Sequence, residues 1–157
     1  MAKAVKTVAM RQLDALGVPY KAVWQEEATF HAEDAAQARG LPLSRVVKSL
    51  LVVAPGRKYY LALVQGDRML SLHKLATVLG MKGLSMARHD EVAAITGYEP
   101  GSVSPLGLKK RIAVVMDEHI LAEELVSISG GKHTLGLELN PADLMRATGA
   151  RSADITQ

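Results

Sequence analysis

A loop rich in glycine and proline, residues 97–107, is the stretch of the chain most suited to bind a reacting group. It reads Gly-Tyr-Glu-Pro-Gly-Ser-Val-Ser-Pro-Leu-Gly and lies between two apolar, structured stretches. Glycine permits backbone angles and close approaches that other residues disfavour, and proline fixes the path of the chain. The small residues leave backbone N–H groups free for a ligand oxygen, as in an anion or oxyanion cradle. An irregular surface loop is an equally good interpretation.

Lys48 is the second candidate, because it lies inside the apolar stretch 46–53. Strand alternation places it on the same face as Val46 and Leu50, where an ammonium group without an anionic partner is costly. One interpretation is a cation that binds a phosphate or polarises a carbonyl. The other is a lysine on an edge strand, whose ammonium group reaches water.

Two further motifs each have a structural and a functional interpretation. Ser129-Gly-Gly-Lys132 is typical of a hairpin turn, but its missing side chains would also make room for a ligand. His133 beside it is either solvated or a hydrogen-bond donor to that ligand. Lys109-Lys-Arg111 is usually a solvated run, whereas next to a ligand cradle it would guide a nucleic-acid backbone.

Several kinds of active site are disfavoured by the residues that the chain lacks or spaces apart. It has no cysteine, which excludes a disulfide framework, a thiolate zinc site and a cysteine nucleophile. No two of the five histidines are three or four residues apart, so we expect neither a metal site nor a cofactor. Phosphate-loop, dinucleotide-binding and Gly-x-Ser-x-Gly patterns are missing as well. Asp117 at a strand end is better explained as a helix cap than as a catalytic acid.

Composition and charge are those of an ordinary globular chain with a mild basic excess. The 157 residues are 48% hydrophobic and 22% charged, which suits one domain, residues 1–157, with a real core. Aromatic residues make up only 4%, which disfavours a base-stacking platform. A net charge of +3 permits a polyanionic partner without requiring one. Without cysteines, a signal peptide or a membrane-spanning run, we expect a cytoplasmic protein that does not bind a membrane.

Hydrophobic periodicity and capping residues predict the elements that position these candidates. Helices are expected at residues 5–16, 31–39, 71–79, 91–95, 118–123 and 141–148. Strands are expected at residues 20–24, 46–54, 59–64, 84–86, 112–116, 125–129, 134–139 and 152–155. Hairpins are frequent and room for regular βαβ crossovers is scarce. We therefore predict an α+β fold with a mixed, mostly antiparallel and strongly curved sheet surrounded by helices.

Four motifs together resemble a known family. They are Arg-Val-Val-Lys-Ser-Leu around Lys48, Thr-Gly-Tyr-x-x-Gly-Ser-Val-Ser-Pro-Leu-Gly at 96–107, Ser-Gly-Gly-Lys at 129–132, and Leu-Glu-Leu-x-x-x-Asp-Leu at 137–144. Their order and spacing resemble the YbaK/ProX family of trans-acting aminoacyl-tRNA deacylases. They are also similar to the editing insertion domain of bacterial prolyl-tRNA synthetases. The resemblance covers roughly residues 4–155.

This resemblance implies a fold, an activity and a set of site residues. The fold would be a curved, barrel-like mixed sheet surrounded by helices. The activity would be hydrolysis of the ester between a wrong amino acid, such as cysteine on tRNA(Pro) or another small one, and the terminal adenosine. Lys48 would hold the substrate near its carbonyl or terminal phosphate, and the backbone at Gly101 would contact the ester. The residues expected to line the substrate pocket are Tyr20, Phe30, Ser102, Val103, Ser104, Ser129, Gly130 and Gly131.

The mechanism that we expect is substrate-assisted, because the ester is already activated and the chain offers no evident nucleophile. Water, the neighbouring ribose hydroxyl or the substrate's own side chain would attack, while backbone groups and Lys48 position the ester. Some family members, including the Cys-tRNA(Pro) deacylase type, carry an acidic residue at the position of Gly136. Because this chain has glycine there, its amino-acid specificity stays open. The expected partner is the 3′ end of an aminoacyl-tRNA, with prolyl-tRNA synthetase as a further candidate. The alternatives are a non-catalytic adaptor that binds tRNA or a synthetase, and a small-molecule-binding domain.

Overall fold

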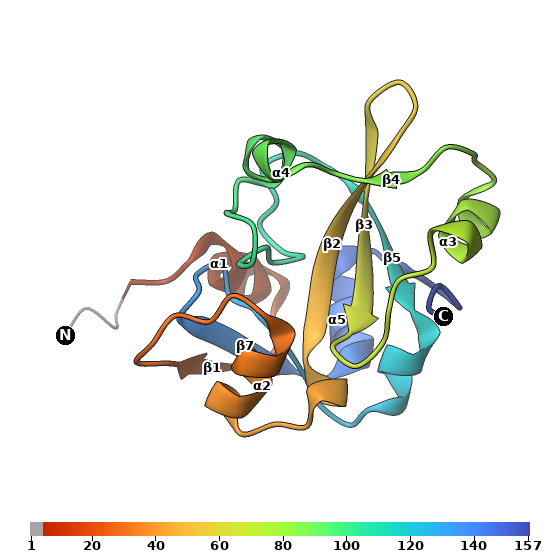
Figure 1. The fold of residues 1–157 in the computed structure, drawn as a ribbon. Helices are drawn as coiled ribbons and strands as arrows, with labels where there is room; N and C mark the ends of the chain where they lie inside the picture. The colour runs from red at the N-terminus through yellow and green to blue at the C-terminus, as the bar shows by residue number, and fades with distance from the viewer. Residues whose placement is uncertain (1–4) are drawn as a thin grey trace.

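The computed structural model describes residues 5–157, and its helices and strands follow one another in the order shown in Figure 1. The α-helices are α1 (Val8–Leu16), α2 (Ala32–Arg39), α3 (Leu72–Leu79), α4 (His89–Thr96) and α5 (Pro141–Thr148), with 3₁₀ turns η2 (Leu43–Arg45) and η3 (Glu118–Ala122). The strands are β1 (Lys21–Trp24), β2 (Val47–Ala54), β3 (Lys58–Gln65), β4 (Ser85–Met86), β5 (Ala113–Asp117), β6 (Val126–Ser129), β7 (Leu135–Leu139) and β8 (Arg151–Ala153).

The strands form two sheets. One has the order β4-β2-β3-β5-β8 and the other the order β1-β7-β6, and a parallel bridge between Val46 and Ser127 joins them. The β2–β3 hairpin runs through the middle of the molecule (Figure 1), while β3–β5 and β5–β8 are the parallel pairs within the described residues. The predicted α+β fold with mixed, mostly antiparallel pairing is therefore confirmed, but the strands are divided between two sheets.

Local sequence explains where the helices begin and end. The Asn140 side chain accepts hydrogen bonds from the first turn of α5, and Pro141 occupies a position where no N–H is needed. Ser71 caps α3 in the same way, and Gly80 ends that helix in the left-handed region. The helix predicted at residues 118–123 is instead the 3₁₀ turn η3. It is too short for an α-helix and is capped by the Asp117 side chain, as predicted for this residue.

The core is aliphatic and lies on both faces of β2. Val47 and Leu51 belong to the larger cluster between the two sheets, whereas Leu50 and Val52 pack in a smaller cluster toward α3. Lys48 thus lies on the face of Leu50, as the alternation predicted. Within residues 5–157, no helix is long and apolar enough to cross a membrane.

Candidate active site

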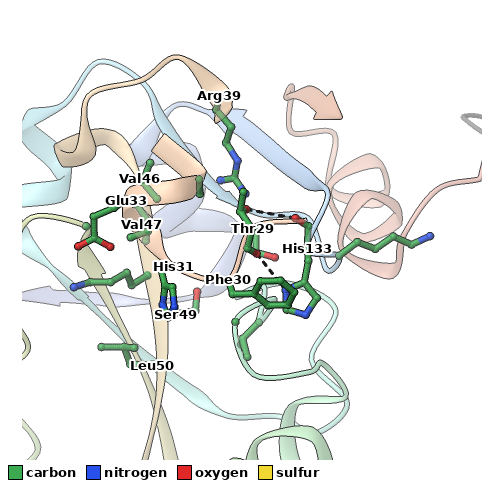
Figure 2. Close-up of a pocket in the computed structure, with 18 residues that line it drawn as sticks. Thr29, Phe30, His31, Glu33, Arg39, Val46, Val47, Ser49, Leu50 and His133 are labelled. Carbon is green, nitrogen blue, oxygen red and sulfur yellow. Dashed lines mark hydrogen bonds between the residues drawn. The ribbon is translucent and has the colours of Figure 1, made fainter. Parts of the chain in front are cut away.

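A cavity of about 290 Å³ lies between α2, the first half of β2, the glycine-rich loop and the β6–β7 turn (Figure 2). This volume is near the lower end of small-molecule pockets, which are roughly 300–1,000 Å³. The residues predicted for the site that line this cavity are Phe30, Lys48, Gly101, Val103 and Ser129. Segments far apart in the sequence are therefore brought to one small space.

Lys48 projects from β2 at the wall of this cavity. Its ammonium group is half-buried and donates a hydrogen bond of 2.8 Å to the carbonyl of Arg68. Burial lowers the pKa of Lys48 from its ordinary value, and the charges of Glu33 and Asp67 oppose that shift. An ammonium group has three donors, so Lys48 retains donors for a ligand oxygen beyond its bond to Arg68.

The glycine-rich loop presents backbone N–H groups to the same cavity. Gly101 has φ of +88°, a left-handed conformation that favours glycine. Among the described residues, no partner accepts a hydrogen bond from the N–H of Gly101, Val103 or Ser104. Gly101 and Val103 both line the cavity, and unpaired backbone N–H groups of this kind can bind an anionic oxygen.

The loop is held rigidly against the core and the neighbouring β6–β7 turn. The Tyr98 hydroxyl donates to the carbonyl of Leu106, and burial raises the pKa of Tyr98 to about 12. Ser129 Oγ donates to the carbonyl of Ser102 over 2.7 Å and accepts from the Gly131 N–H over 3.1 Å. These bonds preorganise the cavity wall, which is what an oxyanion cradle requires.

Other residues predicted for the pocket lie outside the cavity lining. Ser102 and Ser104 belong to the loop, but their side chains are buried, and a side chain at Gly131 would meet the Tyr98 ring at 2.8 Å. Gly130 donates its N–H to Leu135 across the hairpin. Tyr20 is not brought to the cavity, because its hydroxyl donates to Asp14 near α1. The residues of this second group are Tyr20, Ser102, Ser104, Gly130 and Gly131.

His133 closes one side of the cavity, although the sequence left it as either solvated or a donor. Its ring centroid lies 4.3 Å from that of Phe30, and its Nδ1 is 3.3 Å from the carbonyl oxygen of Thr29. Its Nε2 is 3.3 Å from a carboxylate oxygen of Glu99 in the glycine-rich loop. A Cβ at Gly101 would lie 3.2 Å from the His133 ring, so this glycine leaves the space that the ring needs.

Two cavity residues that the sequence did not single out are Ser49 and Arg39 (Figure 2). Ser49 Oγ is the one fully buried side-chain oxygen or nitrogen in residues 5–157 that has no hydrogen-bond partner. β4 pairs with β2 only at Val52 and Val53, so the edge of β2 at Ser49 is open. The position of Ser49 directly after Lys48 in the strand was the signal that could have indicated it. Arg39 had no such signal.

A second polar cluster, the C-terminal cluster, consists of Asp117, His119 and Asp154. Asp117 is fully buried, and its oxygens accept from the backbone and ring of His119, from the Ile155 N–H and from the Thr156 hydroxyl. These bonds tie the C-terminal segment to the end of β5. The hydrogen-bonding capacity of Asp117 is thus used within the fold.

In contrast to Lys48 and Arg39, four further positive side chains of this region are exposed. Lys132 lines the cavity and is solvent-exposed, as are Lys109, Lys110 and Arg111 after the glycine-rich loop. Such residues suit contact with a negatively charged backbone outside the cavity.

Comparison with known proteins connects this geometry to a family. The sequence model described as the aminoacyl-tRNA editing domain matches residues 26–147. A relative from Enterococcus faecalis, provisionally named Cys-tRNA(Pro)/Cys-tRNA(Cys) deacylase EbsC, is 32% identical over 154 residues, which cover 96% of this chain and 93% of that protein. A proline–tRNA ligase from Xanthomonas oryzae is 37% identical over 108 residues, which cover 67% of this chain and 19% of the ligase.

The fold is shared as well. A crystal structure described provisionally as a trans-editing enzyme for prolyl tRNA synthetase has a TM-score of 0.87 and 31% sequence identity to this chain. The match covers 98% of this chain and 99% of the other. Likeness in sequence and in fold therefore extends over nearly the whole chain.

Proposed function

Because the chain belongs to the aminoacyl-tRNA editing domain family, as its four motifs predicted, we propose that it hydrolyses the ester between a wrongly attached small amino acid and the terminal adenosine of a tRNA. Relatives matched over nearly their whole length carry names of a deacylase and a trans-editing enzyme, which supports editing in trans. The names of these relatives favour tRNA(Pro) as the tRNA and prolyl-tRNA synthetase as a partner. Translation takes place in the cytoplasm, which is the location that we propose.

The observation that carries this proposal is that Lys48 lines the same small cavity as Gly101 and Val103, whose N–H groups are unused within the described residues. An ester carbonyl that enters it would find a cation and backbone donors together. Hydrolysis of an activated ester needs chiefly such stabilisation of negative charge on the carbonyl oxygen. The two sheets that support the cavity would curve toward one another in the barrel-like manner that the resemblance implies.

The proposed reaction is direct attack on the ester carbonyl by a substrate-assisted water. The water oxygen bonds to the carbonyl carbon, the bond from that carbon to the ribose oxygen breaks, and the ribose oxygen takes up a proton. Lys48 and the loop N–H groups stabilise the oxyanion. The ribose hydroxyl beside the ester is positioned to orient the water. No protein side chain forms a covalent bond with the substrate.

The test is to incubate the protein with Cys-, Ala- and Ser-charged tRNA(Pro) and with correctly charged Pro-tRNA(Pro), and to measure loss of the ester. We expect rapid hydrolysis of at least one small mischarged ester and sparing of the prolyl ester. Hydrolysis of none of the three would contradict the proposal. A non-catalytic adaptor would then be indicated by tRNA binding without turnover, measured by filter retention.

A further inference from the structure

We propose that Arg39 selects the amino acid, because its guanidinium group donates a hydrogen bond to an oxygen on the aminoacyl side chain. A small hydroxylated amino acid, such as serine, is thereby preferred over alanine, which has no such oxygen. The inference rests on the proposed function, since it names the substrate class of the same cavity.

Arg39 is the last residue of α2, and its side chain lines the cavity (Figure 2). Two hydrogen bonds fix its guanidinium group. Nε donates to the side-chain oxygen of Gln25 over 2.8 Å, and Nη1 donates to the hydroxyl of Ser127 over 2.9 Å. Ser127 is fully buried on β6, so this hydrogen bond anchors the guanidinium group in the interior of the fold.

Gly136 makes room for this arrangement. A Cβ at Gly136 would lie 2.5 Å from Nε and 2.7 Å from Cζ of Arg39, so the guanidinium group rests directly on the backbone of β7. Any side chain at position 136 would displace it. The glycine and the arginine are therefore two parts of one structural feature.

The charge of Arg39 has no carboxylate partner at ion-pair distance among the described residues, since both of its hydrogen bonds go to neutral groups. Burial lowers the pKa of Arg39, and the charge of Glu138 opposes this shift. Nη2 donates to no described residue and is not fully buried, and Arg39 is one of the residues that line the cavity. A cation with unused donors beside a cavity favours a ligand that brings an acceptor.

The shape of the site indicates which part of the substrate reaches Arg39. Gly101 is exposed, whereas Ser127 and Gly136 beside the guanidinium group are buried. The tRNA must remain outside, so its ester lies near Gly101 and only the amino-acid side chain extends inward. A hydroxyl oxygen there accepts from Nη2, and a methyl group cannot. Loss of a hydrogen bond to a charged group reduces kcat/KM by about tenfold.

The experiment compares kcat/KM for hydrolysis of Ser-tRNA(Pro) and Ala-tRNA(Pro). We expect the unaltered protein to favour the seryl ester by about tenfold, and Arg39→Met to remove this preference by slowing the seryl reaction alone. Gly136→Ala displaces the guanidinium group without changing the charge and should act in the same direction. Arg45→Met is the matched control, because Arg45 pairs with Glu123 outside the cavity lining. Thermal unfolding of each variant reports whether it is folded.

Three outcomes would overturn the inference. One is an equal fall for both esters in Arg39→Met. Another is an effect of Arg39→Met that is present with tRNA but absent with 3′-O-seryl-adenosine, which would assign the contact to a phosphate. If the unaltered protein hydrolyses neither of these esters nor the cysteinyl ester, the proposed function fails. Calorimetry then measures the binding of seryl and alanyl amides of 3′-amino-3′-deoxyadenosine. The inference then stands if the seryl amide binds about tenfold tighter and Arg39→Met removes the difference, and it falls if the two bind equally.

Discussion

The cavity and the C-terminal cluster both gather polar side chains, but they differ in whether the hydrogen-bonding groups are already used. In the C-terminal cluster, Asp117 accepts from His119, Ile155 and Thr156. At the cavity, Ser49 Oγ has no partner, and the N–H of Gly101 bonds to no described residue. Polar groups satisfied within the chain hold the fold together, whereas unsatisfied groups on a cavity wall are available to a ligand.

The largest expected difference between the two regions concerns two lysines that each donate to a backbone carbonyl. Lys48 Nζ donates to Arg68 over 2.8 Å, and Lys74 Nζ donates to Thr156 over 2.7 Å beside the C-terminal cluster. We expect Lys48→Ala to lower kcat/KM for ester hydrolysis by about 100-fold, because a charged donor to the oxyanion is lost. Single-turnover hydrolysis of a mischarged tRNA measures this effect.

Lys74→Ala is the matched control for this prediction. It removes a hydrogen bond of the same kind at a partly exposed residue that does not line the cavity, so activity should stay within about twofold. Equal losses in the two variants would mean that Lys48 acts on the fold rather than on the ester. Unchanged deacylation in Lys48→Ala would remove it from the proposed mechanism.

The second prediction concerns a substitution in the C-terminal cluster, where we expect a loss of stability rather than of activity. Asp117→Ala leaves the Ile155 N–H and the His119 ring without their buried acceptor. The free energy of unfolding should fall by about 2 kcal/mol, while the activity of each folded molecule stays the same. Urea denaturation measures the first quantity, and the rate of hydrolysis per mole of folded protein measures the second.

Asp154→Ala serves as the control for Asp117→Ala. Asp154 belongs to the same cluster but is exposed, and its carboxylate pairs with Lys74 over 3.0 Å. Its removal should leave the unfolding midpoint nearly unchanged. A loss of activity per folded molecule in Asp117→Ala would instead show that this cluster takes part in catalysis.

Much of the fold could be predicted from the sequence, because its signals are local. Asn140 followed by Pro141 predicted the start of α5, and Gly80 predicted the end of α3. The apolar stretch of β2 predicted a buried strand. The division of the strands into two sheets was not predicted, because it depends on pairing between strands far apart in the chain, such as β1 with β7.

The candidate site was predictable only where a motif carried it. Lys48 and Gly101 lie in motifs, and the structure brings both to the cavity. Arg39 gives no sign in the sequence, because its position depends on contacts with Ser127 and Gly136 in strands that follow much later. The resemblance to the family placed Tyr20 in the pocket, but its hydroxyl donates to Asp14 of α1 instead.

The smallest expected effect concerns Gly101. Its test separates the steric effect of an added methyl group at the cavity from the backbone strain that the same substitution causes. Gly101→Ala places a Cβ at φ of +88°, 3.2 Å from the His133 ring and 3.3 Å from the carbonyl oxygen of Phe30. Gly149→Ala is the matched control, since Gly149 has φ of +68° and nothing within 4 Å of a Cβ. Both changes should lower the free energy of unfolding by about 1 kcal/mol, because L side chains disfavour this conformation. Only Gly101→Ala should slow hydrolysis, by about fivefold, because His133 must shift to admit the methyl group. Equal kinetics in the two variants would show that the ester does not approach the backbone at Gly101.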